Sequence, residues 1–274
     1  MVATAISRMT LPDRYSVAGI QVSAATYESA TAAVATAAQA GRSLLLSATP
    51  AHAITLGATD RDLGRRWNAF DLLVPDGQPV RWALQLLHGV RLPDRVYGPT
   101  LMLRVCEEAA RTGAGIYLYG SRPEVLDRLR RNLMERFPGL EISGYRSPPF
   151  RPTTPEEDAD DVRDILSSGA KILFLGLGCP RQDEWAFAHR DRLPMPILCV
   201  GAAFDFHAGT VRQAPSWMQG IGMEWVFRLI MEPRRLWRRY ATSNPLFVML
   251  VARQMLSPGA TRWPRPAGSG TARL

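Results

Sequence analysis

The sequence predicts an α/β fold: a Rossmann-like parallel sheet core followed by a helical, Arg- and Trp-rich C-terminal appendage. Two observations support this prediction. Short apolar runs alternate with stretches of helical length from residue 15 to about residue 215, which is typical of parallel sheets with crossover helices. Beyond residue 215 the chain becomes an apolar stretch that carries three tryptophans and a cluster of arginines.

Each element is predicted from its local pattern. Residues 15–22 indicate a first strand or hairpin, and short apolar runs that end in proline or glycine predict strands at 42–50 and 71–77. Helices are expected where the sequence is Ala-rich or amphipathic, at 27–41, 51–70, 100–115 and 154–170. Strand–turn–helix units are expected at 115–139 and 171–193, and strands followed by loops at 140–150 and 195–209.

Local details refine three of these elements. Gly57 is a flaw in the helix expected at 51–70. Ser121 and Glu124 have the spacing of a capping box, so Ser121 is expected to be the N-cap of the following helix. In the appendage, two apolar helical segments flank Pro233, and a third helix is expected after Asn244–Pro245.

The chain therefore divides into four predicted regions. They are a flexible N-terminus (1–14), an α/β core (15–215), a helical appendage (216–256), and a disordered Pro/Gly-rich tail (257–274).

Composition restricts the function classes. The net charge is +8, which favours an acidic partner such as nucleic acid, anionic lipid or a phosphorylated small molecule. The three cysteines have neither the spacing of a metal site nor that of a disulfide framework, so a reducing cytoplasm is expected. The sequence shows no signal-peptide pattern and no apolar run long enough for a transmembrane helix.

Asp76 and Gly77 come after an apolar run, Phe70 to Val74, that stops at Pro75. Two roles are open for Asp76. Asp-Gly between apolar residues is typical of a tight turn. A carboxylate at the end of a buried strand is also typical of a catalytic residue, because Rossmann-like folds bind ligands beyond the carboxyl ends of their strands. Local sequence does not decide between the two roles.

Other strand ends carry candidate binding residues. Gly176 and Gly178 precede a helix, so their backbone amides can meet a phosphate, although a plain strand–helix turn fits about equally well. Gln182 and Glu184 lie in the first turn of that helix, where they can contact a base or a sugar or simply face solvent. Gly120 can let a ligand approach closely.

Three further polar residues follow predicted strands. Thr49 and His52 can contact a substrate hydroxyl, although a lone histidine is more often structural. Asp205 can orient a substrate or can bond its own backbone in a turn. The four histidines have no ligand-spaced companions, so no metal site is predicted.

The appendage admits four interpretations. It can lie on a membrane, with tryptophans at the interface and arginines on anionic headgroups. It can bind nucleic acid, or pack on the core with solvated arginines. Its arginines can also bind a diphosphate in forked geometry.

Taken together, five motifs resemble those of the bacterial WecG/TagA/CpsF glycosyltransferase family. They are "DLLVPDGQPV", "RVYGPTL", "IYLYGS", "LFLGLGCPRQDEW" and "VGAAFDFHAGTVRQAPSWMQGIGMEWVFRLIMEPRRLWRRY", in this order between residues 15 and 245. The resemblance implies transfer of a sugar from a UDP donor to a polyprenyl-diphosphate-linked acceptor. It also implies a role in exopolysaccharide, capsule or teichoic acid synthesis at the cytoplasmic face of the membrane.

The resemblance also implies residue roles. Asp76 becomes the general base, with Asp205 as the remaining carboxylate candidate, while Gln182 and Thr49 would lie at the donor site. The arginines expected to face the diphosphate of the acceptor or the leaving UDP, and the membrane, are Arg228, Arg235 and Arg238. The family usually has Asn two residues after the threonine, whereas here Ala51 precedes His52. This change leaves the donor sugar open.

The expected reaction is inverting and uses no cofactor. It is also expected to be independent of metal, because no Asp-x-Asp motif follows an apolar strand. Arginines and helix N-termini would supply the positive charge instead. The alternative is a binding module for nucleotide sugars or nucleic acid without catalysis, but nucleic acid is not the expected partner. Trp217 and Trp225 can also join the appendage to a second copy of the chain, so a homo-oligomer is considered.

Overall fold

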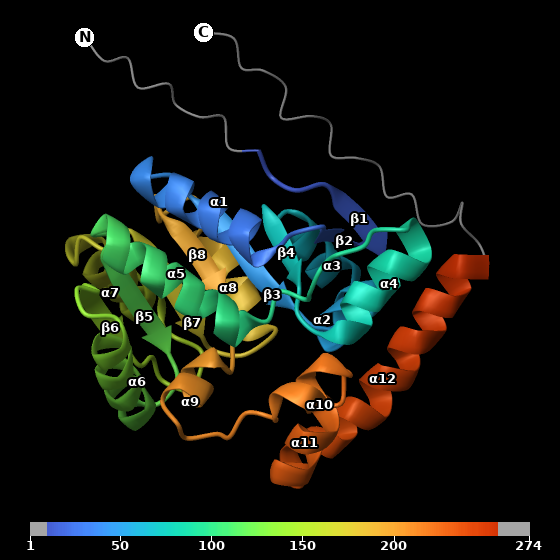
Figure 1. Ribbon diagram of the computed structural model, residues 1–274. Coiled ribbons are helices and arrows are strands. Elements are labelled where there is room, and N and C mark those ends of the chain that lie inside the picture. The colour runs from blue at the N-terminus through green and yellow to red at the C-terminus, as the bar shows by residue number, and fades with distance from the viewer. Residues whose placement is uncertain (1–9, 257–274) are drawn as a thin grey trace, which may run out of the picture.

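The computed structural model describes residues 10–256 and confirms the α/β fold. At its centre is a six-stranded sheet whose neighbouring strands are all parallel (Figure 1). In spatial order the strands are β4 (Leu72–Pro75), β3 (Leu44–Thr49), β8 (Pro196–Cys199), β7 (Ile172–Gly176), β5 (Ile116–Gly120) and β6 (Ile142–Arg146). The N-terminal hairpin is a separate antiparallel pair, β1 (Arg14–Val17) and β2 (Ile20–Ser23).

Helices cover both faces of the sheet because successive strand side chains point to opposite sides. In β3, Leu44 and Leu46 pack into one apolar cluster, whereas Leu45 packs into the other. The first cluster includes residues of α1 (Tyr27–Gln39), α5 (Gly98–Thr112), α6 (Pro123–Arg136) and α9 (Ala203–His207). The second includes residues of α2 (Ala51–Thr59), α3 (Arg61–Asn68), α4 (Gln78–His88), α7 (Pro155–Ser167) and α8 (Arg181–His189).

This arrangement places a topological switch point at the carboxyl edge of the sheet between β3 and β8, here called the crevice. Strands β3 and β8 are neighbours, yet β3 leads into α2 on one face and β8 leads into α9 on the other. In open α/β sheets, ligands bind where adjacent strands diverge in this way. The fold therefore directs attention to the residues that follow β3, β4 and β8.

The helix expected at 51–70 is two helices, α2 and α3, and the break is at Asp60 rather than at Gly57. The Asp60 side chain accepts hydrogen bonds from the backbone N–H groups of Asp62 and Leu63, so it caps α3. Gly57 serves close packing instead: a Cβ there would lie 2.7 Å from the Trp67 ring. The sequence analysis also did not assign α4, which begins directly after Gly77.

The capping-box prediction for Ser121 is wrong. Ser121 has a positive φ of 60°, and its backbone N–H donates to the carbonyl of Gly176 at 3.1 Å. The chain is therefore still tied to β7 at this point, and Arg122 is the N-cap of α6 without a side-chain hydrogen bond.

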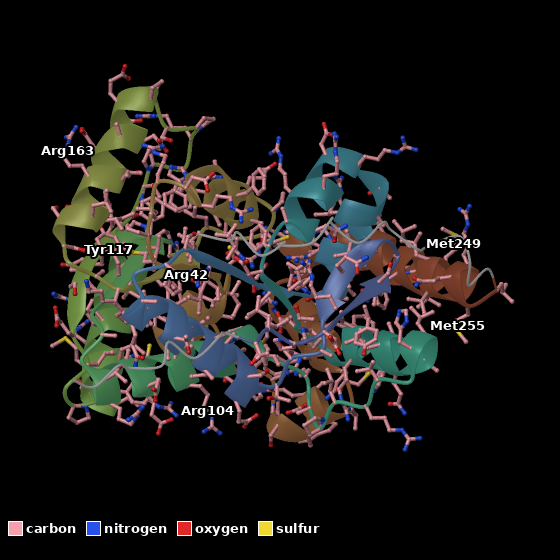
Figure 2. All side chains as sticks on the ribbon, turned by 90° about the horizontal axis from the view of Figure 1, so that it is seen from above. Arg42, Arg104, Tyr117, Arg163, Met249 and Met255 are labelled. Atoms are coloured by element: carbon pink, nitrogen blue, oxygen red, sulfur yellow. The ribbon has the colours of Figure 1, made fainter. Side chains whose placement is uncertain are left out.

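Three helices form the C-terminal segment: α10 (Ser216–Gly220), α11 (Glu224–Met231) and α12 (Pro233–Leu256). The separate helix expected after Pro245 does not exist, because α12 continues through this proline. Figure 1 shows α12 running along one side of the core beside α2 and α4, and both contacts are present. In Figure 2, Met249 and Met255 project from its outer part.

The last turn of α12 is fixed to the N-terminal hairpin. The Gln254 side chain accepts a hydrogen bond from Ala18 N–H at 2.7 Å and donates one to the Ser16 carbonyl at 2.8 Å. Gln254 is buried, so these bonds are shielded from water. The flexible stretch expected at 1–14 lies mostly outside the described residues, as does the expected tail at 257–274.

Candidate active site

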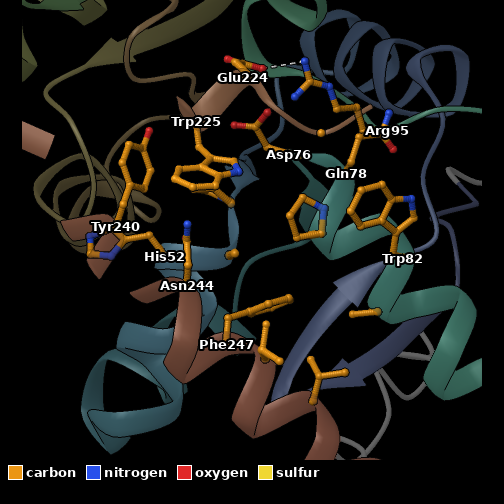
Figure 3. A pocket seen from close by; sticks show the side chains of 18 of the residues that line it. His52, Asp76, Gln78, Trp82, Arg95, Glu224, Trp225, Tyr240, Asn244 and Phe247 are labelled. Atoms are coloured by element: carbon orange, nitrogen blue, oxygen red, sulfur yellow. Dashed lines mark ion pairs between the residues drawn. The ribbon is translucent and has the colours of Figure 1, made fainter. Parts of the chain in front are cut away.

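A cavity of about 580 Å³ lies beyond the carboxyl ends of β3 and β4 and is closed on its other side by α11 and α12 (Figure 3). Such a volume is in the range of small-molecule sites. The core supplies Pro50, Ala51 and His52 after β3, and Asp76, Gly77, Gln78 and Pro79 after β4. The C-terminal segment supplies Glu224, Trp225 and Arg228 from α11, and Arg239, Tyr240, Asn244 and Phe247 from α12.

Asp76 is held at the cavity wall by its backbone. Its N–H donates to the Thr49 carbonyl at 3.2 Å, which extends the pairing of β4 with β3 by one residue. Its Oδ1 accepts a hydrogen bond from Gly98 N–H at 3.4 Å. Gly77 follows with a φ of 119°, a conformation that glycine adopts without strain, and turns the chain into α4. The turn and the cavity-lining carboxylate are thus parts of one structure.

Burial raises the pKa of Asp76 from 3.8 to about 6. Nearby charges act in both directions: Arg95 and Arg228 lower the pKa, whereas Glu224 raises it. A carboxyl group with a pKa close to physiological pH is largely ionised at pH 7 and still accepts a proton readily. Asp76 is therefore a candidate general base.

Arg95, Tyr97 and Glu224 form a buried polar group beside Asp76. Arg95 Nη2 lies 2.7 Å from Glu224 Oε2, and the Tyr97 hydroxyl donates to Glu224 Oε1 at 2.8 Å. The Arg95 guanidinium also stacks 4.2 Å from the centre of the Tyr97 ring and donates to Gln219 Oε1 at 2.9 Å. Because Glu224 belongs to α11, this group anchors the C-terminal segment to the core next to the candidate base.

Two arginines bring further positive charge to the cavity. Arg228 lies over Phe206, with its guanidinium carbon 5.6 Å from the ring centre, and Arg239 is partly buried in α12. Neither forms an ion pair with another residue between 10 and 256. The N-terminus of α2 borders the same cavity through Pro50, Ala51 and His52, and a helix N-terminus also favours anions. This part of the cavity is suited to a diphosphate.

His52 lines the cavity but is engaged with α12. Its Nδ1 lies 2.7 Å from the Ser243 hydroxyl oxygen. Burial, reinforced by the positive charge of Arg239, lowers the pKa of His52 to about 4, so the ring is neutral at physiological pH. His52 therefore joins α2 to α12, and it can offer only a neutral polar contact to a ligand.

Thr49 and Gln182 are near the crevice between β3 and β8 but do not border the cavity. Thr49 is fully buried, and its hydroxyl donates to the Ser47 carbonyl at 3.1 Å. Gln182 is 3% exposed, and its Oε1 has no hydrogen-bond partner among the described residues. Its amide lies next to Gly201, where a Cβ would be 3.7 Å away. The unpaired oxygen of Gln182 is a candidate contact for a ligand in the crevice.

The predicted glycines have different roles. A Cβ on Gly120 would lie 2.6 Å from the carbonyl carbon of Gly176, and one on Gly176 would lie 2.5 Å from the Phe204 ring. These two glycines permit close packing between β5, β7 and α9 rather than the approach of a ligand. Gly178 has a φ of 80° with open space around it, so it forms the turn before α8.

Several predicted binding residues lie outside the cavity. Glu184 is on the surface, with Oε1 3.7 Å from Arg66. Asp205 belongs to the short helix α9, and its Oδ1 accepts a hydrogen bond from the Thr210 hydroxyl at 3.3 Å. It behaves as a turn residue and does not come near Asp76 in the cavity lining.

Arg235 and Arg238 also project away from the cavity lining. Arg235 pairs with Glu232 at 2.9 Å on the surface of α12. Arg238 lies against Trp237, with its guanidinium carbon 5.3 Å from the ring centre. Of the three arginines named from the family resemblance, Arg228 alone borders the cavity.

The sequence analysis did not single out Arg95, Tyr97, Glu224 or Arg239 as site residues. Arg95 and Tyr97 were visible in the motif "RVYGPTL", which follows the Asp76 strand end by one helix. Glu224 was detectable as an acidic residue within a mostly apolar and basic segment. Among residues 10–256, His, Cys, Asp and Glu side chains nowhere gather in threes that could hold a metal ion.

Asp183 is a second buried carboxyl group with a perturbed pKa, but it lies away from the cavity lining. Its Oδ1 accepts a hydrogen bond from the Ser47 hydroxyl at 2.5 Å. Burial raises the pKa of Asp183 to about 6. It joins α8 to β3 behind the crevice.

Comparison with known proteins identifies the family. The profile of the glycosyl transferase WecG/TagA/CpsF family matches residues 15–261, which is most of the chain. The protein belongs to this glycosyltransferase family. In this glycosyltransferase, residues 15–261 contain the α/β core and all three C-terminal helices, so the family match includes the whole cavity.

Two similar relatives share the name N-acetylglucosaminyldiphosphoundecaprenol N-acetyl-beta-D-mannosaminyltransferase. The one from Bacillus subtilis (strain 168) is 26% identical over 216 residues, covering 78% of this chain and 81% of the relative. The one from Bacillus spizizenii (strain ATCC 23059 / NRRL B-14472 / W23) is 30% identical over 183 residues, covering 66% and 68%.

Proposed function

We propose that this glycosyltransferase moves a sugar from a UDP-sugar to a polyprenyl-diphosphate-linked glycan with inversion at the anomeric carbon. The product would serve a cell-surface polysaccharide of the exopolysaccharide, capsule or teichoic acid type. One observation carries the proposal: a carboxyl group with a pKa of about 6, Asp76, faces the same cavity as Arg228, Arg239 and the N-terminus of α2. The names of the two relatives support the lipid-linked acceptor.

The proposed reaction is a single displacement. The acceptor hydroxyl donates its proton to the ionised Asp76 carboxylate while its oxygen forms a bond to the anomeric carbon of the donor sugar. The bond from that carbon to the diphosphate oxygen breaks on the opposite side, and UDP leaves with the bonding electrons. Asp76 then returns the proton to water. Such a positioned base typically contributes about 10²- to 10⁴-fold to the rate.

In this proposal, protein groups supply the positive charge that binds the diphosphates. Arg228 and Arg239 border the cavity, whereas the charge of Arg95 is balanced by Glu224. Arginine binds phosphate oxygens in pairs, and its contribution grows in a site from which water is displaced. The first turn of α2 adds backbone N–H groups at the same place. The proposal therefore keeps the expectation that no metal ion is required.

The donor nucleotide is assigned to the crevice between β3 and β8, beside Asp76. The support is the divergence of the two strands and the unpaired Oε1 of Gln182. Ala51 borders the cavity and offers only a methyl group where the family usually has an amide. We therefore leave the sugar open among UDP-N-acetylmannosamine, its uronic acid, UDP-glucose and UDP-glucuronic acid.

The enzyme is further proposed to act on the inner face of the cell membrane as a peripheral protein. No described helix is long and apolar enough to cross a membrane. Instead, large apolar side chains of the C-terminal helices are exposed next to arginines: Trp217 is 65% exposed, Ile230 70% and Trp237 52%. Tryptophan with arginine is a favourable combination for the interface with anionic lipid.

The test is UDP release from a panel of UDP-sugars in the presence of a synthetic polyprenyl-diphosphate-linked N-acetylglucosamine. One donor is expected to give acceptor-dependent UDP release and a glycosylated lipid of the matching mass. Binding of UDP-sugars without transfer to any acceptor, or tight binding of single-stranded DNA without transfer, would instead favour the non-catalytic binding module.

A further inference from the structure

The cavity does not end at its charged groups but includes an apolar groove between α4 and α12, here called the α4–α12 groove. Phe247 and Val251 form its floor and are buried. Its rims are apolar side chains that remain exposed: Trp82, Leu86, Val248 and Met255. Figure 3 shows Asp76, Arg95 and Glu224 together at one end of the cavity and Phe247 toward the other.

The sequence of α12 explains how one helix lines both ends. The side chains at 240, 244, 247, 251 and 255 recur at intervals of three or four residues and so lie on one helix face. The early positions, Tyr240 and Asn244, are polar and follow Arg239, whereas those after Pro245 are apolar. The lining that α12 supplies therefore changes from polar and cationic to apolar along the cavity.

The groove has the dimensions of an elongated apolar chain. Phe247 and Met255 are two turns apart on α12, which is about 12 Å at the helical rise. On α4, Trp82 and Leu86 are one turn apart and form the facing rim. Leu86 is 62% exposed and Val248 66% exposed, so both rims present apolar surface to water. Contiguous apolar surface of this kind usually marks a binding site.

We propose that the α4–α12 groove holds the isoprenoid units next to the diphosphate of the acceptor. The proposal rests on the proposed function, because it places the lipid part of that acceptor. A prenyl chain bonded to a diphosphate needs an apolar channel that opens directly onto cationic groups, and Arg239 and Val248 lie on the same helix within one cavity. A second protein copy requires no such continuity. The enzyme would thus recognise its acceptor by the lipid as well as by the sugar.

Matched variants on α12 test the proposal. Val248 and Met249 are neighbours in the sequence and similarly exposed, at 66% and 60%, but only Val248 borders the groove. Val248→Gln, alone and combined with Leu86→Gln, is compared with Met249→Gln in the full chain. Because all three residues are exposed, the variants are expected to fold, which thermal unfolding checks. Calorimetric titration with farnesyl diphosphate and with methyl diphosphate measures the contribution of the tail.

The wild type is expected to bind farnesyl diphosphate at least about tenfold more tightly than methyl diphosphate, as burial of several methylene groups predicts. The double variant should lose most of this preference, and Met249→Gln should keep it. No preference in the wild type, or equal loss in Val248→Gln and Met249→Gln, would overturn the proposal. The proposal would also be overturned if Val248→Gln changes only vesicle binding or the oligomeric state, since the groove would then contact bilayer lipid or another copy of the chain.

Transfer assays separate this proposal from the proposed function. If the enzyme glycosylates N-acetylglucosaminyl diphosphates equally well with farnesyl and methyl tails, the groove has no role in acceptor choice and the function stands. If farnesyl diphosphate binds preferentially but no sugar is transferred to any acceptor, the groove stands and the proposed function fails.

Discussion

Replacing Asp76 with asparagine should strongly slow catalysis and, at neutral pH, stabilise the protein. The side chain keeps its shape, and its Oδ1 can still accept the hydrogen bond from Gly98 N–H. The asparagine amide cannot take a proton, so transfer should fall by about 10²- to 10⁴-fold. The stability effect arises because burial holds the pKa of Asp76 at about 6, above its ordinary value of 3.8.

The sign and size of the stability effect follow from linkage. The folded state favours protonated Asp76. Ionisation of Asp76 therefore leaves the free energy of unfolding unchanged below pH 3.8 and lowers it by the full amount above about pH 6. At about 1.4 kcal/mol per pKa unit, the two values imply an upper limit of about 3 kcal/mol. The cavity admits water, so we expect Asp76→Asn to gain about 1–2 kcal/mol at pH 7.5, or about 2–8 °C in Tm for a chain of this size.

The assay is urea unfolding followed by circular dichroism at pH 7.5 and pH 4, together with UDP release at pH 7.5. Asp183→Asn is the matched control: burial also raises the pKa of Asp183 to about 6, but Asp183 does not border the cavity. This control should show a similar pH-dependent gain in stability and retain most of its transfer activity. The reasoning is refuted if Asp76→Asn is no more stable than the wild type at pH 7.5, or if its gain is equally large at pH 4.

Further outcomes are expected from pH, metal removal and charge substitutions. The kcat/KM of the wild type should rise through about pH 6 as Asp76 ionises and then level off. Glu224→Gln should move this rise to lower pH, since the Glu224 charge raises the pKa of Asp76; an unmoved or upward-shifted profile would contradict this coupling. Transfer should persist in excess EDTA, and a loss restored by Mg²⁺ would contradict the role given to arginines. Arg228→Ala should lower kcat/KM about 100-fold. The double variant Arg235→Glu/Arg238→Glu should mainly weaken binding to anionic vesicles. Transfer to a short-tailed soluble acceptor is the control for this double variant.

Patterns within short segments were sufficient to predict the core of the fold. Apolar runs such as 42–50 and 71–77 become β3 and β4 because strands buried on both faces need no polar alternation. The failures occurred where a distant contact overrides a local signal. Ser121 is held in register by Gly176 instead of capping α6, and α12 continues through Pro245 because its flanks pack on α2 and α4.

The candidate site was predictable only where one strand end carries the chemistry. Asp76 follows a buried strand directly, so its position at the carboxyl edge could be inferred from the strand alone. The pairing of Arg95 with Glu224 joins the core to α11 and has no local signature. Arginine spacing likewise did not show that Arg228 would face the cavity while Arg235 and Arg238 face outward, since that depends on how α11 and α12 dock.

The hydrogen bonds between Gln254 and the hairpin at Ser16 and Ala18 have a consequence for the order of synthesis. The ribosome makes the hairpin and Asp76 well before α12. A nascent chain therefore carries its base without the wall that completes the cavity. Because Gln254 ties the end of α12 to the hairpin, chains that end before α12 would lack this wall of the cavity and would bind neither donor nor lipid acceptor productively.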